Sequence, residues 1–189
     1  MTADDERSVI AATRRWIERA VIGLNLCPFA RTAFETDGIR YAVSAARDVD
    51  SLVADLDVEL RRLHDAETTE CETTLLIHPH VLQDFLDYND FLDVADATLD
   101  ALDLGDAIQI ASFHPSYQFA ETSPDDVENY TNRSPFPMLH LLRQASVDRA
   151  VAAFPDTAAI YRSNVATLRR LGAEGWRKLW FHSMEEGNA

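Results

Sequence analysis

The chain has 189 residues, of which 47% are hydrophobic and 26% charged, so it can bury the core of a globular domain. Lysine and arginine number 17 against 32 for aspartate and glutamate, and the resulting net charge of −15 argues against a nucleic-acid or anionic-membrane partner. We therefore predict one domain over residues 1–189, a small-molecule ligand, no nucleic acid and no membrane among its partners.

Hydrophobic periodicity predicts helices that alternate with short strands along the chain. The expected helices cover residues 4–24, 50–64, 82–102, 137–154 and 157–171. The expected strands cover residues 39–45, 73–78 and 107–113. This alternation predicts an α/β fold: a small, mainly parallel three-stranded sheet with crossover helices, an N-terminal helix and two C-terminal helices. The alternative is an α+β fold with a mixed sheet, in which residues 117–120 would form an antiparallel edge strand.

Two of the predicted strands end in the same dipeptide, His-Pro. His78 precedes Pro79 and His114 precedes Pro115. Parallel strands bring their carboxyl ends to one edge of a sheet, where ligands of open α/β sheets bind, so we expect both imidazoles there. His80 lies two residues after His78, and in extended backbone the two side chains would share a face.

These histidines leave three interpretations open. With His78, His80 and His114 as ligands, a divalent zinc or iron ion would keep an open position for water, and Asp84 or Asp87 would complete the site. Without a metal, the imidazoles would act as acid and base near neutral pH. In the third interpretation they are structural, and bond to the backbone at the strand ends.

Residues 116–137 form an unusually long connection, which is typical of a binding loop or a lid. Arg133 is conspicuous in so acidic a chain, since a guanidinium can hold a carboxylate or phosphate by two hydrogen bonds. The alternative is an ion pair with a nearby acid: Asp125, Asp126 or Glu128. The residues expected to bind substrate are Arg133, Tyr117, Asn129 and Tyr130, although aromatic residues in such loops also anchor them to the core.

The two cysteines are not expected to be nucleophiles. Cys27 follows the end of the first predicted helix, where the dipole disfavours a thiolate, and Cys71 lies between two glutamates. The acidic first residues lack the pattern of a signal peptide, so we predict a cytoplasmic protein with reduced thiols. His140, in the predicted helix 137–154, is either a fourth imidazole at the site or a satisfied residue at the edge of an apolar face.

Several motifs occur in a fixed order along the chain. They are AVIGLNLCPFA at residues 20–30, LLIHP at 75–79, FLDYN at 85–89, SFHP at 112–115, ENYTNRSP at 128–135 and HLLR at 140–143. In this order they resemble the bacterial proteins grouped as domain of unknown function 1415. The resemblance spans nearly the whole chain and implies a free-standing bacterial cytoplasmic protein. It transfers no catalytic residue, cofactor or substrate.

The residues thus lead to one main functional hypothesis and two alternatives. The first is a small enzyme acting on a polar or anionic small molecule, with His78, His80 and His114 as catalytic residues or metal ligands and Arg133 orienting the substrate. The second is a non-catalytic module that binds a small molecule or a metal. The third is an interaction protein whose C-terminal helices contact a partner or a second copy in a homo-oligomer.

Overall fold

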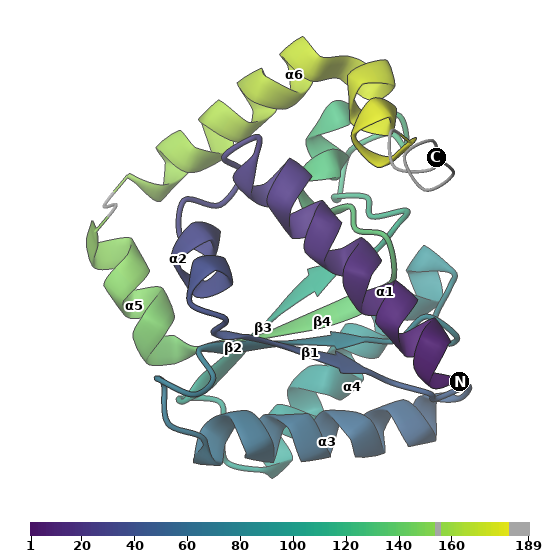
Figure 1. Cartoon of the computed structure of the whole chain (residues 1–189), viewed down its shortest axis with the longest axis vertical. Coiled ribbons are helices and arrows are strands. Elements are labelled where there is room, and N and C mark those ends of the chain that lie inside the picture. The colour runs from purple at the N-terminus through teal and green to yellow at the C-terminus, as the bar shows by residue number, and fades with distance from the viewer. Residues whose placement is uncertain (154–155, 182–189) are drawn as a thin grey trace.

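In the computed structural model, which describes residues 1–153 and 156–181, helices lie on both faces of a mixed four-stranded sheet (Figure 1). The strands are β1 (Ile39–Val43), β2 (Thr73–Ile77), β3 (Ile108–Phe113) and β4 (Met138–Arg143), in the order β1-β2-β4-β3. β1 pairs with β2 in parallel, and β4 runs antiparallel to both β2 and β3. β1, β2 and β3 therefore share one direction and end at one edge, which we call the carboxyl edge.

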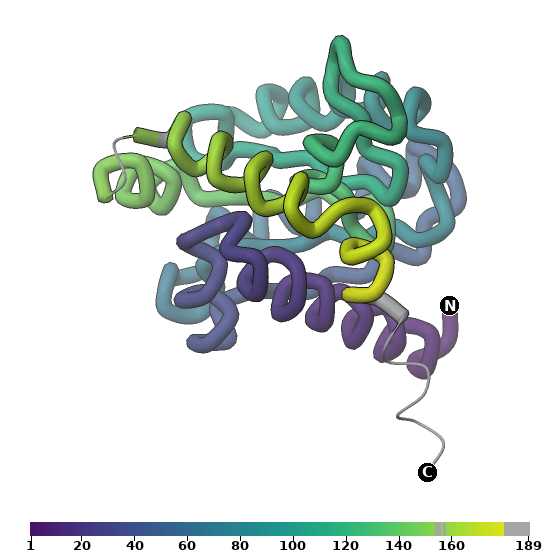
Figure 2. Tube along the Cα trace, turned by 90° about the horizontal axis from the view of Figure 1, so that it is seen from above, coloured from purple at the N-terminus to yellow at the C-terminus, as the bar shows by residue number. Residues whose placement is uncertain are grey.

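The helices form two layers around this sheet. They are α1 (Ala3–Trp16) with its π-helical continuation η1 (Ile17–Ile22), α2 (Ala30–Glu35), α3 (Val49–Asp65), α4 (Phe85–Ala101), the 3₁₀ helix η2 (Val127–Asn132), α5 (Gln144–Ala153) and α6 (Thr157–Phe181). α3 and α4 cover one face, and α1, α2 and α6 lie over the other (Figure 1). Figure 2 shows the same arrangement from above, and Arg19 of η1 donates to the Leu179 carbonyl of α6 at 3.4 Å. Within residues 1–153 and 156–181, no helix has both the length and the apolar composition needed to cross a membrane.

The sheet has a hydrophobic core on each face, and side chains that alternate along the central strands contribute to both. β2 is buried at all five positions, as expected of a strand covered on both faces. Leu76, Leu139 and Leu141 belong to the core on the α3 and α4 side, whereas Leu75, Ile77 and Met138 belong to the core on the α1 and α6 side. Successive side chains of a strand point to opposite faces, so each strand contributes to both cores.

The three predicted strands are confirmed to within two residues at each end, but the sheet is mixed and has a fourth strand. The mixed sheet of the α+β alternative is confirmed in place of the mainly parallel one, but its antiparallel edge strand is β3 and not residues 117–120, which are irregular. The predicted helix 137–154 is also wrong in its first half, which is β4, and its expected end at residue 154 lies outside the described residues. That the chain is one domain stays a prediction.

The β4 segment, MLHLLR, consists largely of residues that favour helices. It forms a strand because both of its edges are paired: His140 lies opposite Leu75 on β2 and opposite Ala111 on β3. Pairing on two sides and burial on two faces outweigh a propensity difference of a few tenths of a kcal/mol per residue. Tertiary context therefore decides this element.

Tyr88 of α4 fastens that helix to the carboxyl edge. Its fully buried hydroxyl donates to the Met138 carbonyl oxygen at 2.9 Å and accepts the Phe113 N–H at 3.0 Å. Met138 and Phe113 are paired in the last step of the β3–β4 ladder. One phenol thus joins the end of β3, the start of β4 and the helix that packs beneath them.

We expect Tyr88→Phe to lower the free energy of unfolding by about 2 kcal/mol, because it leaves a buried carbonyl and a buried N–H without a partner. Urea denaturation measures this effect. Tyr161→Phe is the matched control, since its side chain is 55% exposed and the change there should cost less than about 0.5 kcal/mol. Equal stability of the two variants would contradict the assigned role of Tyr88.

Candidate functional site

The two histidines that follow β2 and β3 both lie at the carboxyl edge, where each contacts the same aromatic ring. The backbone N–H of His78 donates to the Pro137 carbonyl at 3.0 Å, and that of His114 donates to the Asn132 carbonyl at 3.1 Å. Both imidazoles contact the ring of Tyr88, with centroids 5.8 Å apart for His78 and 5.0 Å apart for His114. They lie on the α3 and α4 side of the sheet.

The hydrogen-bond partners assign a tautomer to each ring. His78 Nδ1 lies 3.1 Å from the Val81 carbonyl oxygen, which can only accept, so Nδ1 carries the proton. His114 Nδ1 accepts the Ser116 N–H at 3.0 Å, so its proton is on Nε2, which donates to the Leu82 carbonyl at 3.2 Å. Both rings are therefore neutral, and both hold the loop after β2, as the structural interpretation expects.

Burial disfavours the charged form of these rings. It lowers the pKa of His78 to about 4, and the neighbouring His114 lowers it further than burial alone would. Burial also lowers the pKa of His114, against an opposing contribution from its bond to Leu82. Because both pKa values lie below the ordinary value of 6.5, the pair is uncharged at neutral pH.

His140 does not join this pair. It lies within β4 on the opposite face of the sheet, where its Nε2 is 2.8 Å from Thr73 Oγ1. The Thr73 hydroxyl donates to the Leu141 carbonyl at 2.6 Å, so it accepts from the imidazole. Burial lowers the pKa of His140 to about 4. Of the two interpretations, the satisfied residue is the one that the structure shows.

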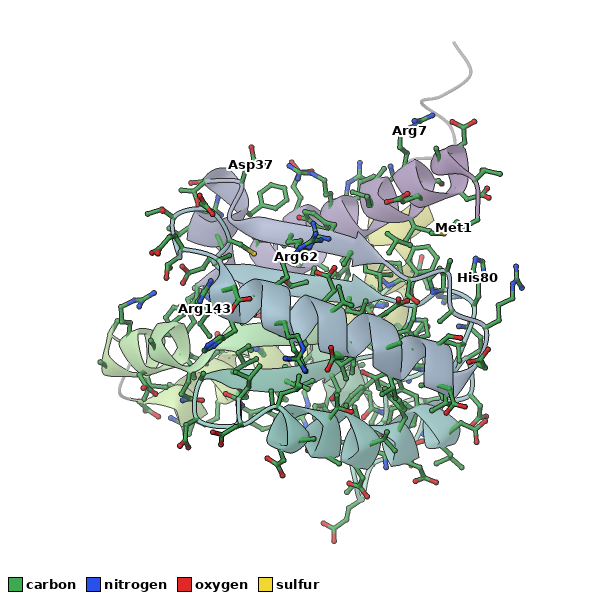
Figure 3. The ribbon with its side chains drawn as sticks, turned by 90° about the horizontal axis from the view of Figure 1, so that it is seen from below. Met1, Arg7, Asp37, Arg62, His80 and Arg143 are labelled. Carbon is green, nitrogen blue, oxygen red and sulfur yellow. The ribbon has the colours of Figure 1, made fainter. Side chains whose placement is uncertain are left out.

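The structure does not bring His78, His80 and His114 together as a set of metal ligands, and metal binding by them stays a prediction. Pro79 ends β2, so the extended backbone does not continue, and His80 is exposed and projects outward (Figure 3). Both ring nitrogens of His114 are already bonded, and Asp84 caps α4. β4 also separates β2 from β3 by two strand spacings, or about 10 Å. No group of three or more His, Cys, Asp or Glu residues among those described is placed to hold a metal ion.

The Arg133 side chain forms no ion pair with Asp125, Asp126 or Glu128 and instead bonds to backbone carbonyls. Its Nε donates to the Tyr117 carbonyl at 3.3 Å and one terminal nitrogen donates to the Pro124 carbonyl at 2.6 Å. The guanidinium carbon lies 4.7 Å from the centroid of the Tyr130 ring. In the described part of the chain no carboxylate approaches it within 4.0 Å, and Glu128 pairs instead with Arg169. The predicted ion pair is therefore wrong.

The long segment between β3 and β4 is folded on itself. The fully buried Asn129 accepts the Phe119 N–H at 2.9 Å and the Thr122 hydroxyl at 2.8 Å, and it donates to the Ser123 carbonyl at 2.8 Å. Tyr130 is also buried and stacks on Trp176, with centroids 5.2 Å apart. The half-buried Tyr117 packs edge-on against Phe119. These contacts organise the segment, and the roles of Tyr117, Asn129 and Tyr130 in substrate binding stay predictions.

A hollow of about 300 Å³ opens beside this segment. Its lining consists of Pro115, Arg133, Ser134, Pro135 and Trp176. Sequence reasoning selected Arg133 but missed Trp176, because an aromatic residue near the end of a chain indicates packing and nothing more specific. Another hollow, of about 400 Å³, lies between η2 and α6 and is bounded by exposed arginines that have carboxylate partners, Arg162 and Arg169. The first is the better candidate for a ligand, because its arginine lacks a carboxylate partner.

The low pKa of His78 makes stability depend on pH. Its pKa is about 4 in the folded chain, against the ordinary value of 6.5, so the unfolded chain binds the proton first and stability falls as the pH drops below 6.5. We expect this residue to cost about 2 kcal/mol between pH 7 and pH 5.

Urea denaturation at the two pH values measures that loss. In His78→Asn the amide nitrogen occupies the place of Nδ1 and does not titrate, so the loss should shrink by about 2 kcal/mol. An unchanged pH dependence in the variant would show that His78 is not the group responsible.

Comparison with known proteins shows which family the chain belongs to. No curated protein and no solved structure gives a significant match to the chain. A family model described as "Protein of unknown function (DUF1415)" matches residues 8–178, which include every strand and all of the site residues discussed above. The chain therefore belongs to the DUF1415 family.

Proposed function

We propose that this protein binds a small anionic molecule in the hollow beside Arg133. The carrying observation is a fixed guanidinium that lines a cavity and has no carboxylate within 4.0 Å among the described residues. The chain has a net charge of −15, and although Asp125 acts electrostatically on this cation, no carboxylate among the described residues lies within 4.0 Å of it. A guanidinium without a carboxylate in contact, in a protein with so many acids, is suited to bind an anionic ligand.

Arg133 is held in place before a ligand arrives. The Trp16 indole N–H donates to its backbone carbonyl at 3.0 Å, and its side chain is tied to the Tyr117 and Pro124 carbonyls. These two carbonyls and the Tyr130 side chain occupy part of the guanidinium's five N–H groups, which leaves others for a ligand. Burial lowers the pKa of Arg133, but an arginine remains charged at neutral pH. Such pre-organisation reduces the entropy lost on binding.

The other walls indicate what else the ligand carries. Trp176, Pro115 and Pro135 offer apolar surface around the cation. A carboxylate or phosphate would take the guanidinium N–H groups, preferably in bidentate fashion, while a flat apolar portion would lie against the indole. The volume of about 300 Å³ suits a small metabolite. We favour a ligand with one anionic end and one apolar end.

The binding module is the better supported of the functional hypotheses. The hollow lies toward α1 and α6, since Trp16 bonds to Arg133 and Trp176 forms a wall. His78 and His114 contact Tyr88 on the other side of the sheet. This arrangement favours ligand binding over the orientation of a substrate toward those imidazoles, and the proposed function is ligand binding.

Isothermal titration calorimetry with phosphate and phenyl phosphate tests the proposal. We expect both anions to bind, phenyl phosphate the more tightly because its ring contacts Trp176. Arg133→Met should weaken binding at least tenfold, and Arg133→Lys should lie between, since it keeps the charge but loses the planar fork.

Arg169→Met is the matched control, because that exposed arginine lines the other hollow and already pairs with Glu128. It should leave the affinities unchanged. Melting temperatures of all variants report whether the loop stays folded. Failure of the unmodified protein to bind either anion, or equal losses in the Arg133 and Arg169 variants, would overturn the proposal.

A further inference from the structure

The backbone of Ser134 has polar groups that the fold leaves without partners at the hollow beside Arg133. Ser134 is only 5% exposed, and it is one of the residues that line the hollow. Within the described residues, neither its N–H nor its carbonyl takes part in a hydrogen bond. Nearly all buried N–H groups in native proteins are paired, and an unpaired one is unfavourable. The Ser134 N–H therefore needs an acceptor that these residues do not supply.

No neighbouring group in the loop takes the place of this donor. The Ser134 hydroxyl donates to the Phe136 carbonyl at 2.7 Å, so its proton is already used. Pro115 and Pro135 line the same hollow and have no N–H. The backbone N–H of Arg133 donates to the Tyr130 carbonyl at 3.3 Å. In this part of the lining, the Ser134 N–H is thus the main-chain donor that remains for a ligand.

The position of Ser134 before a proline determines how its two backbone groups point. A residue that precedes proline is restricted to extended conformations. In extended backbone the N–H and the carbonyl of one residue point to the same side, as they do where two antiparallel strands exchange a pair of hydrogen bonds. Arg133 is extended as well, with φ −80° and ψ 131°, and the Trp16 indole N–H holds its carbonyl at 3.0 Å. The loop therefore presents a donor and an acceptor side by side.

We propose that this pair binds an amide group, and that the ligand of the hollow is an N-acylated amino acid with an apolar side chain. The inference rests on the anion binding by Arg133 proposed above. An amide offers its carbonyl to the Ser134 N–H and its N–H to the Ser134 carbonyl, as a neighbouring strand does. In an N-acylated amino acid a single carbon separates the amide nitrogen from the carboxylate, which matches the consecutive positions of Arg133 and Ser134. The apolar side chain lies against Trp176.

A free amino acid fits this lining less well than an acylated one. Its ammonium group has donors only, so it leaves the Ser134 N–H without an acceptor. None of the five lining residues is an acid that would balance the ammonium charge. Acylation removes that charge and adds the missing acceptor. The guanidinium thus selects for the carboxylate, and the Ser134 backbone selects for the amide.

Isothermal titration calorimetry with carboxylates that share one benzyl group tests this assignment. We expect N-acetylphenylalanine to bind about tenfold more tightly than 3-phenylpropionate, which lacks the amide, because two hydrogen bonds are gained. Its ester analogue, O-acetyl-3-phenyllactate, keeps the carbonyl but has no N–H, so its affinity should lie between. Phenylalanine should bind no more tightly than 3-phenylpropionate. Gly-Gly-phenylalanine carries the same groups at the end of a peptide and should bind more weakly than N-acetylphenylalanine, since the hollow suits a small molecule.

The amide resonance of Ser134 in ¹H–¹⁵N spectra reports the contact directly on unmodified protein. We expect a saturable downfield shift of this proton with N-acetylphenylalanine and a much smaller one with 3-phenylpropionate. Ser134→Pro removes the N–H at an extended position and should abolish the preference for the amide. Arg169→Met, the matched control, should keep both the affinities and the preference.

Several outcomes would overturn the amide assignment and leave anion binding intact. They are equal affinities for N-acetylphenylalanine and 3-phenylpropionate that Arg133→Met weakens alike, and a Ser134 resonance that saturating N-acetylphenylalanine does not move, as when water alone satisfies the N–H. Tighter binding of Gly-Gly-phenylalanine would overturn the assignment to a free small molecule. Failure of phosphate and phenyl phosphate to bind would instead refute the proposed function on which the inference rests.

Discussion

The position of β4 between β2 and β3 is the constraint on which the rest of the molecule depends. β3 ends at the carboxyl edge, and β4 must begin at that same edge because it runs in the opposite direction. The segment that joins them therefore starts and finishes at the edge where β1 and β2 also end. The Tyr88 hydroxyl closes this junction by bonding to both Met138 and Phe113. His78, His114 and the hollow beside Arg133 are found near this edge because the topology fixes both ends of the long connection between β3 and β4 there.

Much of the fold follows from local pattern. The short β-prone runs and the amphipathic helices have periodicities that their burial explains, so β2 and α3 lie within a residue or two of where they are expected. The β4 segment does not, because a short apolar run fits a helix or a strand equally well. What decides it is the presence of two partners, and those partners come from residues at least 25 positions away. No local window contains that information.

The candidate site divides in the same way. His78 and His114 meet because strand direction is predictable from the crossover helices, and direction alone sends both side chains to one edge. Their tautomers depend on which carbonyls the loop presents, and the role of His80 depends on how the chain turns after Pro79. Arg133 illustrates the same limit: its partners are backbone carbonyls of an irregular segment, and no spacing rule anticipates them. The position of a side chain on a strand or helix can be predicted from the sequence, whereas the contacts of an irregular segment are known only from the structure.

The bend in α6 has a consequence for when the hollow beside Arg133 comes into being. Gly172 adopts a φ of +65°, open to glycine but costly for other residues, and interrupts the helix before Trp176, which stacks on Tyr130. During synthesis on the ribosome, Arg133 and its loop emerge well ahead of that tryptophan. A nascent chain would thus display the cation without its aromatic wall. The proposed recognition of an anion by both the guanidinium and the indole would therefore begin only after Trp176 has been made and has packed on Tyr130.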